Sequence, residues 1–257
     1  MRDIDYGLVN EIVVEAGSQL KTACGKDLNY TRKGRFDFVT EMDVRIQNRL
    51  MEELDRIGAG LNFICEENEK NDLAYDDAWL IDPIDGTTNF IHGYPHYCIA
   101  LAHVRDREVK YAVIYNPVSK ELFTAEKGKG AFLNGSRIRV SEIRQLEASI
   151  VIVGFPYDRD KGEAVFEMMK SLHKKCSDIK RRGSASLDFA DVACGRAEAY
   201  FEMNLKPWDT APGYLLVTEA GGRVRCSGDF LGSGNSFHAM ASNGLTQIPE
   251  LEGFLML

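Results

Sequence analysis

The sequence is most informative where it reads Trp79-Leu80-Ile81-Asp82-Pro83-Ile84-Asp85-Gly86-Thr87-Thr88-Asn89. The apolar run Ala78–Ile81 predicts a short buried strand that ends directly at a carboxylate. Gly86 allows the backbone to approach a ligand closely, and Thr87 and Thr88 then open a helix whose free N–H groups suit a phosphate. A strand that leads through an acidic turn into a helix indicates a layered α/β fold with a site at the strand end.

Acidic residues at the ends of three expected elements predict a cation site. Asp82 and Asp85 are three apart across a Pro-Ile turn, Glu66 follows another apolar run, and Asp209 begins an expected helix. If these four carboxylates converge, their repulsion raises their pKa values, and a divalent cation relieves it. All-oxygen ligands favour Mg²⁺ or Mn²⁺ over zinc or copper. A metal pair held by carboxylates suits in-line displacement at phosphorus.

Apolar periodicity predicts helices alternating with short strands along the whole chain. In the first half we expect a helix with Ile4, Leu8, Ile12, Ala16 and Leu20 on one face, a strand around Phe36–Val39, a helix capped by Thr40 with Val44, Leu50, Leu54 and Ile57 as its apolar stripe, strands Leu61–Cys65 and Ala78–Ile81, and a hairpin of His96–Val104 with Val109–Tyr115. In the second half we expect strands Ser149–Val153, Ile179–Arg181 and Glu198–Glu202, and helices Glu163–His173, Leu187–Cys194 and Asp209–Ala220, the last closed by Gly221-Gly222. The pattern indicates one domain, 1–257, with structural halves of about 1–140 and 141–257.

Bulk composition excludes several classes of protein. Lys+Arg of 31 against Asp+Glu of 39 gives a net charge of 31 − 39 = −8, which makes a nucleic-acid partner unlikely. The six cysteines have no C-x-x-C spacing, so we expect reduced, mostly buried thiols rather than a zinc cluster or a disulfide framework. The charged amino terminus lacks the apolar stretch of a signal peptide, and no apolar run is long enough to span a bilayer. We therefore expect a cytoplasmic protein without a membrane partner.

Two long blocks and two short ones resemble the inositol monophosphatase family. The long blocks are Trp79–Phe90 and the pair Lys206-Pro207-Trp208-Asp209 and Glu219-Ala220-Gly221-Gly222. The short blocks are Phe38–Asp43 and Ile64–Glu67, and all four occur in the family's order. The resemblance spans essentially the whole chain. It implies a five-layer αβαβα sandwich of the inositol monophosphatase and fructose-bisphosphatase type, usually assembled as a homodimer.

The resemblance also implies a metal site. Glu66, Asp82 and the Ile84 carbonyl would hold the metal that activates water, and Asp82, Asp85 and Asp209 would hold a second one. The family implies two or three Mg²⁺ ions per site, with Mn²⁺ as a substitute and frequent sensitivity to lithium.

The catalytic and substrate residues follow from the same resemblance. Thr87 would position the attacking water together with Glu66, and Asp43 would orient Thr87. The phosphate would meet the main-chain N–H groups of Gly86 and Thr87, while Glu202 and the Ala185 backbone would lie against the substrate's hydroxyls. The implied substrate-binding residues are Asp85, Gly86, Thr87, Thr88, Ala185, Glu202 and Asp209.

Simpler interpretations exist for some of these residues. Spacing alone leaves open whether Asp43 is only the N3 carboxylate of a capping box and whether Asp209 only charges the start of its helix. Cys65 stands where relatives often carry Gly, and Pro212 replaces a small residue, although neither change removes a ligand.

Two other polar groups carry no functional expectation. His92 and His96 are separated by Gly93 and Pro95, so they are expected to be loop histidines rather than a pair on a helix. The basic run Lys180-Arg181-Arg182 is expected to be a solvated face.

The expected function is Mg²⁺-dependent hydrolysis of a phosphate monoester of a small polyol or sugar by a metal-activated water. Inositol 1-phosphate is the first choice, since the chain lacks large insertions; fructose 1,6-bisphosphate, 3′-phosphoadenosine 5′-phosphate, histidinol phosphate and NADP are alternatives within the family. An aspartyl-phosphate phosphatase needs two aspartates separated by one residue, whereas two residues lie between Asp82 and Asp85. A non-enzymatic alternative is a protein that binds a metal or a sugar phosphate.

Overall fold

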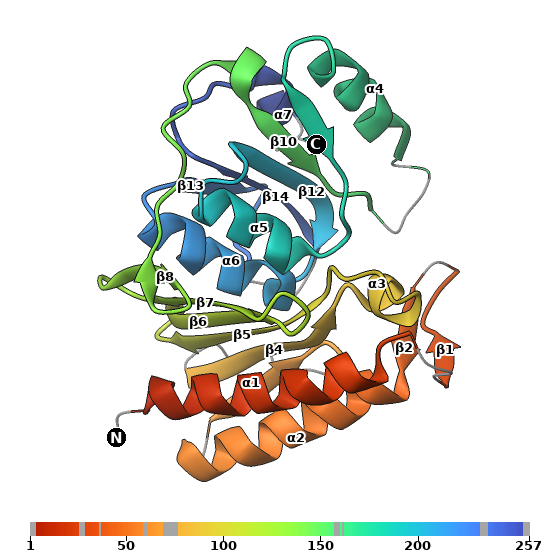
Figure 1. The fold of residues 1–257 in the computed structure, drawn as a ribbon, viewed down its shortest axis with the longest axis vertical. Coiled ribbons are helices and arrows are strands. Elements are labelled where there is room, and N and C mark those ends of the chain that lie inside the picture. Colours follow the sequence, from red (N-terminus) through yellow and green to blue (C-terminus); the bar gives the residue numbers. More distant parts are fainter. Residues whose placement is uncertain are drawn as a thin grey trace.

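The molecule is built from five stacked layers. The computed structural model describes residues 4–25, 29–35, 37–58, 61–68, 77–156, 160, 162–231 and 236–253. In Figure 1 the layers follow one another as the helix pair α1 and α2, a seven-stranded sheet, the pair α5 and α6, a five-stranded sheet, and the pair α4 and α7. The expected α/β class and its five-layer arrangement are confirmed.

The first half of the chain supplies the outer helix pair and the larger sheet. Its helices are α1 (Tyr6–Ala23), α2 (Glu41–Ile57) and the short α3 (Thr87–Ile91), and a small hairpin is formed by β1 (Tyr30–Arg32) and β2 (Phe38–Thr40). The sheet has the order β3-β4-β5-β6-β7-β8-β9 and contains β3 (Asn62–Cys65), β4 (Asp77–Asp85), β5 (Cys98–Arg105), β6 (Glu108–Asn116), β7 (Glu121–Glu126), β8 (Gly130–Leu133) and β9 (Ser136–Arg137).

The second half supplies the other three layers. Its sheet has the order β11-β10-β12-β14-β13 and contains β10 (Ile150–Val153), β11 (Asp178–Lys180), β12 (Ala199–Leu205), β13 (Arg223–Cys226) and β14 (Phe237–Ser242). A 3₁₀ turn, Leu146–Ala148, leads into β10. The helices are α4 (Gly162–Leu172), α5 (Ala185–Ala193), α6 (Pro207–Glu219) and α7 (Pro249–Glu252).

Alternation of side chains along the strands builds the cores between these layers. In β4, Trp79 and Ile81 belong to the core under α1 and α2, whereas Ala78 and Leu80 belong to the core that includes α5 and α6. Successive side chains of a strand point to opposite faces of the sheet, so a continuous apolar run fits a strand that is covered on both faces. The larger sheet is therefore an inner layer of the sandwich, with helices packed on both of its faces.

The apolar stripes of α1 and α2 are shifted from their predicted positions. Leu8 and Val44 are exposed, and Ile4 precedes α1. In α1, a strict four-residue spacing drifts by about 40° per step around a helix of 3.6 residues per turn, so the buried positions do not all fall four apart. In α2, Val44 lies two residues from both Met42 and Ile46, about 200° around the helix, and therefore faces away from the buried side. The buried apolar residues are Val9, Ile12, Val13, Ala16 and Leu20 in α1 and Met42, Ile46, Leu50 and Leu54 in α2.

Strand β4 extends beyond its predicted end at Ile81. It continues to Asp85, with a register shift against β5 between Asp82 and Asp85. Pro83 lies within this irregular segment, where a residue without an N–H donor does not interrupt the ladder of hydrogen bonds. Both aspartates consequently lie at the end of a strand that pairs with β5, where Asp82 is opposite Ala100 and Asp85 is opposite Cys98, and not in a free turn.

The other predicted elements are present with slightly shifted ends. The expected helix at Thr40 is confirmed, with a capping box in which Thr40 and Asp43 exchange hydrogen bonds. The predicted start of the preceding strand, Phe36, lies outside the described residues. All six cysteines are free thiols, as expected, although only Cys65 and Cys98 are fully buried. No helix in the described ranges has both the length and the apolar composition to cross a bilayer.

The departures from the family pattern at Cys65 and Pro212 are both buried. Cys65 ends β3, where burial raises the pKa of its thiol to about 12 and keeps it neutral. Pro212 lies inside α6, which continues through it with one intrahelical hydrogen bond fewer. Both residues therefore act through packing.

Helices α5 and α6 cross closely at Gly213. A Cβ placed on this residue would lie 2.3 Å from Cγ of Phe189 in α5, which is closer than non-bonded carbon atoms approach each other. The missing side chain lets the two helices share the narrow layer between the sheets.

We expect Gly213→Ala to lower the free energy of unfolding by about 1–3 kcal/mol, the usual effect of overpacking a core. Alanine favours a helix by only about 1 kcal/mol over glycine, so the clash decides the sign. Urea denaturation measures the change. Gly162→Ala in α4 is the matched control, because no atom lies within 4 Å of the added Cβ. A Gly213→Ala protein as stable as the control would contradict the packing argument.

Candidate active site

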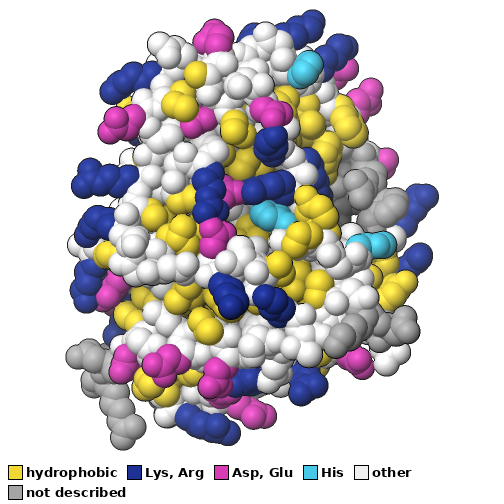
Figure 2. All heavy atoms as spheres, in the orientation of Figure 1, with side chains coloured by type: hydrophobic (Ala, Val, Ile, Leu, Met, Phe, Trp, Pro, Cys, Tyr) yellow, Lys and Arg dark blue, Asp and Glu magenta, His cyan; other side chains and the backbone are white. Residues whose placement is uncertain are grey.

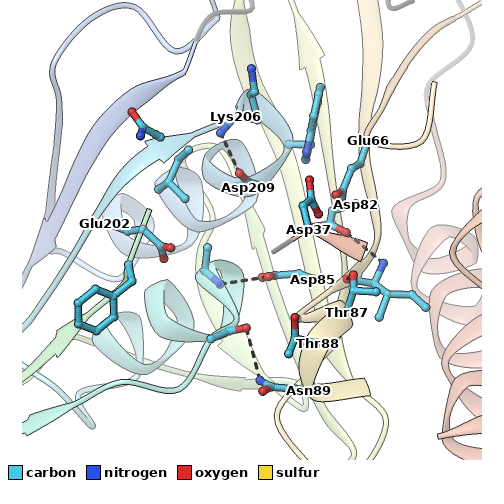
Figure 3. Close-up of a pocket in the computed structure, with 18 of the residues that line it drawn as sticks. Asp37, Glu66, Asp82, Asp85, Thr87, Thr88, Asn89, Glu202, Lys206 and Asp209 are labelled. Atoms are coloured by element: carbon cyan, nitrogen blue, oxygen red, sulfur yellow. Dashed lines mark hydrogen bonds between the residues drawn. The ribbon is translucent and has the colours of Figure 1, made fainter. Parts of the chain in front are cut away.

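The predicted site residues line one cavity of about 470 Å³. The wall comes from the end of β4, the starts of α3, α5 and α6, and strand β12, and Figure 3 shows carboxylates from both halves directed into this space. The predicted residues on its wall are Glu66, Asp82, Ile84, Asp85, Gly86, Thr87, Thr88, Ala185, Glu202 and Asp209. Asp43 is not part of the wall and lies behind Thr87.

Asp82 and Asp209 are held by short backbone contacts. The Ile84 N–H donates to Asp82 Oδ1 at 3.0 Å, and the Lys206 N–H donates to Asp209 Oδ2 at 2.8 Å. Burial, followed by the negative charge of Glu66, raises the pKa of both carboxyls well above their usual range. The two groups therefore resist carrying their charges together unless a cation is added.

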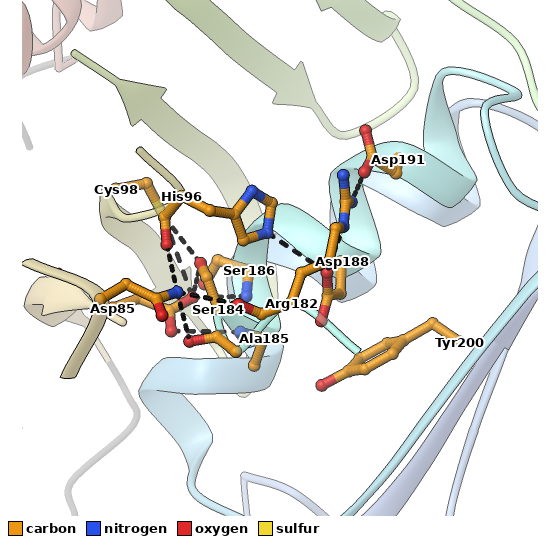
Figure 4. Close-up of polar contacts among 12 residues, drawn as sticks. Asp85, His96, Cys98, Arg182, Ser184, Ala185, Ser186, Asp188, Asp191 and Tyr200 are labelled. Carbon is orange, nitrogen blue, oxygen red and sulfur yellow. Dashed lines mark hydrogen bonds and ion pairs between the residues drawn. The ribbon is translucent and has the colours of Figure 1, made fainter. Parts of the chain in front are cut away.

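Asp85 is held by the start of helix α5. Its Oδ1 accepts the Ala185 N–H at 3.1 Å, and its Oδ2 accepts the Ser184 hydroxyl at 2.9 Å and the Ser186 N–H at 2.5 Å (Figure 4). The buried Cys98 thiol donates to Oδ2 at 3.8 Å. Ser184 is the N-cap residue of α5 but makes no cap with its own side chain. The carboxylate of Asp85 therefore caps α5 from another element and joins the two halves of the chain.

Thr87 and Asp43 form a contact behind the cavity wall. The Thr87 hydroxyl lies 3.0 Å from the Ile84 carbonyl and 3.3 Å from Asp43 Oδ1. The other oxygen, Asp43 Oδ2, accepts both the N–H and the hydroxyl of Thr40. Burial raises the pKa of Asp43 to about 6, although the hydrogen bonds from Thr40 act to lower it. Asp43 thus belongs to the capping box and also contacts Thr87, so the two interpretations of this residue are compatible.

Lys33 is a cation at the acidic side of the cavity. Its Nζ lies 2.9 Å from Glu66 Oε1 and 2.5 Å from Glu67 Oε1. Burial alone would lower the pKa of Lys33, but the two carboxylates outweigh it and the pKa is raised. Burial and the charge of Glu66 raise the pKa of Glu67 to about 7. An ammonium group therefore neutralises part of the acidic cluster in the absence of metal.

Glu202 lies on the far side of the cavity from Glu66. The Tyr200 hydroxyl donates to Glu202 Oε2 at 2.6 Å, and burial raises the pKa of Glu202 to about 8. Near neutral pH this group is therefore largely a carboxylic acid that can donate or accept a hydrogen bond. The Ala185 N–H, expected to face substrate hydroxyls, is donated to Asp85 in this structure. Its contact with a substrate stays a prediction.

The basic run at Lys180–Arg182 is only partly the solvated face that was expected: Lys180 and Arg181 are exposed, whereas Arg182 is half-buried. Arg182 forms ion pairs with Asp188, at 3.3 Å, and with Asp191, and Arg181 lines the cavity and lies over the ring of Phe155. On the face shown in Figure 2, basic and acidic side chains lie next to one another near the middle of the view. Strand β11 ends at Lys180, and the next residues enter the loop before α5, where they meet residues distant in sequence.

Other residues of the cavity wall were missed by the sequence analysis. The wall also contains Lys33, Asp37, Asn89, Phe155, Pro156, Arg181, Gly183, Asn204, Leu205, Lys206 and Trp208. Asn89, Lys206 and Trp208 belong to the blocks quoted above, so proximity to a motif could have identified them. Lys33 and Arg181 carried no signal, because only the fold brings them beside the carboxylates.

The donor set fits a hard divalent cation. Glu66, Asp82, Asp85, Asp209 and the Ile84 carbonyl provide oxygen ligands only, as Mg²⁺ prefers. Among the described residues, no group of three His, Cys, Asp or Glu side chains is arranged to hold an ion without adjustment. Each carboxylate is directed toward a protein donor instead, yet a carboxylate has about four acceptor positions. The hydrogen bonds therefore orient these groups and leave capacity for a metal.

The chain matches known proteins over more than two thirds of their length. The sequence model of the inositol monophosphatase family matches residues 3–246. Nus factor SuhB of Xylella fastidiosa is 42% identical over 198 residues, which cover 77% of this chain and 72% of that protein. Inositol-1-monophosphatase of Caulobacter vibrioides is 40% identical over 206 residues, covering 77% and 79%.

Solved structures share the fold. The IMPase of Thermotoga maritima superposes with a TM-score of 0.84 at 35% identity, covering 93% of this chain and 92% of that one. An IMPase/NADP phosphatase complexed with Mg²⁺ and phosphate has a TM-score of 0.78 at 24% identity, covering 93% and 89%, a likeness that shows the fold alone.

The raised carboxyl pKa values predict a pH-dependent stability of the metal-free protein. Asp43, Glu67 and Glu202 have folded-state pKa values of about 6, 7 and 8, above the value of about 4 expected in the unfolded chain. Their contribution is fully present below about pH 4 and is lost as the pH rises through these folded values. We expect the free energy of unfolding to fall between about pH 5 and pH 8 by at least about 1.4 kcal/mol, the equivalent of one pKa unit.

Urea denaturation in the presence of EDTA measures this fall, and added Mg²⁺ should reduce it. Asp82→Asn should raise the stability of the metal-free protein at about pH 8, because it removes one of the repelling groups. A stability that is constant or rising over this pH range would contradict the electrostatic argument.

Proposed function

The chain belongs to the inositol monophosphatase family, and from this membership and the geometry of the cavity we propose that it is a divalent-metal-dependent phosphatase of small phosphorylated metabolites. The observation that carries the proposal is that the buried Asp82 and Asp85 and the half-buried Asp209 line one cavity together with Gly86 and Thr87. Packing does not explain three carboxyls whose pKa values are raised by desolvation and by neighbouring negative charge. A cation bound next to a helix start does.

The proposed ligands are the five groups that fit the cation. Glu66, Asp82 and the Ile84 carbonyl form one set, and Asp82, Asp85 and Asp209 form the second, with Asp82 common to both. When bound, the metal supplies a water of lowered pKa and stabilises the charge on the departing alkoxide.

The remaining steps belong to residues of the chain. The Thr87 hydroxyl can donate its proton to Asp43 Oδ1, which leaves the lone pairs of Thr87 Oγ1 free to accept a hydrogen bond from the attacking water. Glu66 would orient the same water from the opposite side. The N–H groups of Gly86 and Thr87, at the start of α3, would donate hydrogen bonds to the phosphate oxygens.

We expect the leaving group to be a neutral polyol. Glu202 and Tyr200 offer an uncharged hydrogen-bonding pair at the cavity wall, which suits a hydroxyl better than a second phosphate. Thr88 and the Ala185 backbone would complete this side. The name of the Caulobacter relative, inositol-1-monophosphatase, favours inositol 1-phosphate as the first choice. Fructose 1,6-bisphosphate, 3′-phosphoadenosine 5′-phosphate, histidinol phosphate and NADP are the alternatives.

Further properties belong to the proposal because the family resemblance implies them. They are a preference for Mg²⁺ with two or three ions per site, substitution by Mn²⁺, inhibition by lithium, a homodimer and a location in the cytoplasm. The all-oxygen set of proposed ligands supports the choice of ion.

A panel of phosphate esters tests the activity. We expect phosphate release in the presence of Mg²⁺, none after EDTA treatment, and the largest kcat/KM for inositol 1-phosphate. Asp82→Asn and Glu66→Gln should lower kcat at least about 100-fold, because loss of a partner outside the ligand shell already lowers activity by about 10–100-fold. Release from no ester in the panel would favour a protein that only binds its ligand. Release by Asp82→Asn near the wild-type rate would refute the metal assignment.

Relatives named Nus factor SuhB, including one 41% identical from Escherichia coli, support a second candidate function, that of a Nus factor. Replacing SuhB in Escherichia coli by this chain, or by its Asp82→Asn variant, separates the two. Restored growth with both proteins would show a function that does not need the carboxylate site. Restoration by the wild type alone would tie the function to that site.

A further inference from the structure

The side chain of Asn89 connects two backbone loops at this site. Its Nδ2 donates to the carbonyl oxygens of His96 at 2.6 Å and Arg182 at 2.8 Å, and the Gly183 carbonyl lies at 3.4 Å. All three neighbours are acceptors, so the atom that faces them is the amide nitrogen. The amide has two N–H donors, and both are used by these carbonyls.

The contact joins loops from the two halves of the chain. His96 follows α3, whereas Arg182 and Gly183 lie between β11 and α5. Gly86 packs against the same backbone, since a Cβ on Gly86 would lie 3.0 Å from the His96 carbonyl and 3.2 Å from the Gly183 carbonyl. The Gly86 φ of +93° also favours glycine. Asn89 therefore holds together the carbonyls against which the proposed phosphate turn is packed.

The segment held by Asn89 continues directly into the donors of Asp85. Gly183 is followed by Ser184, Ala185 and Ser186, which donate three hydrogen bonds to the Asp85 carboxylate (Figure 4). A shift of the Arg182–Gly183 backbone therefore moves these donors, and the carboxylate with them.

A second anchor holds the same segment from behind. Arg182 Nε donates to Asp188 Oδ1 at 3.3 Å, and His96 Nε2 lies 3.4 Å from the same oxygen. Asp188 is in α5 and is buried. The loop is thus fixed to α5 on one side, and Asn89 is the side chain that fixes it to α3 on the other.

We propose that Asn89 is a positioning residue of the metal site: by holding the Arg182–Gly183 backbone, it sets the direction in which Ser184 and the start of α5 present Asp85 to the cation. The inference rests on the proposed function, because it takes Asp85 as a metal ligand. A side chain that only cross-links the fold would affect stability and leave the affinity for metal unchanged.

The test compares Asn89→Asp and Asn89→Ala with the wild type. Asn89→Asp keeps the shape of the side chain but places carboxylate oxygens, which are acceptors, opposite three carbonyl oxygens. Asn89→Ala only removes the donors. We expect both to weaken Mn²⁺ binding by about 10–100-fold, the usual effect of removing a partner that orients a metal ligand. Calorimetric titration of the metal-free proteins with Mn²⁺ alone gives the affinity without any substrate.

Asn243→Ala is the matched control. Asn243 is buried, and its Nδ2 donates to the Ile143 carbonyl at 2.7 Å and to Ser141 Oγ at 3.2 Å, in a loop that does not line the cavity. It should lower the melting temperature and leave the Mn²⁺ affinity at the wild-type value. The inference would be overturned if both Asn89 variants behaved like this control, with lower stability and an unchanged affinity for Mn²⁺.

A double-mutant cycle with Ser184→Ala tests whether Asn89 acts on the metal site through Asp85. Ser184 contacts Asp85 directly, so if Asn89 acts through the same carboxylate, the two effects on Mn²⁺ affinity should be less than additive. Additive effects would show that Asn89 acts elsewhere and would overturn the route through Asp85. A wild type that binds Mn²⁺ but hydrolyses no ester refutes the proposed function, whereas the affinity comparison still decides the role of Asn89.

Discussion

The structure depends on the burial of like charges at the boundary between its two halves. Asp82, Asp85 and Asp209 come from two segments more than a hundred residues apart and meet at one cavity, where burial raises the pKa of each carboxyl and neighbouring carboxylates raise it further. Groups of this kind destabilise a fold unless something compensates them. Backbone N–H donors provide part of the compensation, the ammonium group of Lys33 provides another part beside Glu66, and the oxygen-rich cavity is suited to a cation that provides the rest.

The layered fold explains how these groups can be held so closely. Helices α5 and α6 lie between the two sheets, and both begin at the cavity, as does the short α3. The first turn of each helix has N–H groups without a partner inside the helix. Asp85 and Asp209 accept hydrogen bonds from backbone N–H groups at or just before the first residue of α5 and α6. The narrow middle layer, with Gly213 against Phe189, fixes the separation of α5 from α6 and hence of Asp85 from Asp209.

Membership of the inositol monophosphatase family indicates the type of reaction more closely than the physiological role. The relatives that cover most of this chain carry two kinds of name, inositol-1-monophosphatase and Nus factor SuhB, at nearly equal identity. The proposed metal ligands lie in the blocks that define the resemblance, Glu66 in a short block and the others in the long ones. The groups that would select an alcohol, such as Glu202 with Tyr200 and Arg181 over Phe155, lie on β12 and in the loop before α5, outside those blocks.

Apolar periodicity, capping residues and motif spacing are local signals that can be recognised in a sequence. They predicted the α/β layers, the helix that begins after Thr40, and the carboxylates at Glu66, Asp82, Asp85 and Asp209. The same signals misplaced Leu8 and Val44 on buried faces and ended β4 too early, because the rotation of a helix about its axis and the pairing of the end of β4 with β5 are decided by neighbouring elements. Only the tertiary structure brought Lys33 to Glu66, Arg181 to the cavity, and Asn89 to the loop that holds Asp85. These contacts join residues distant in the chain, and their energies depend on burial and distance, which are properties of the folded molecule alone.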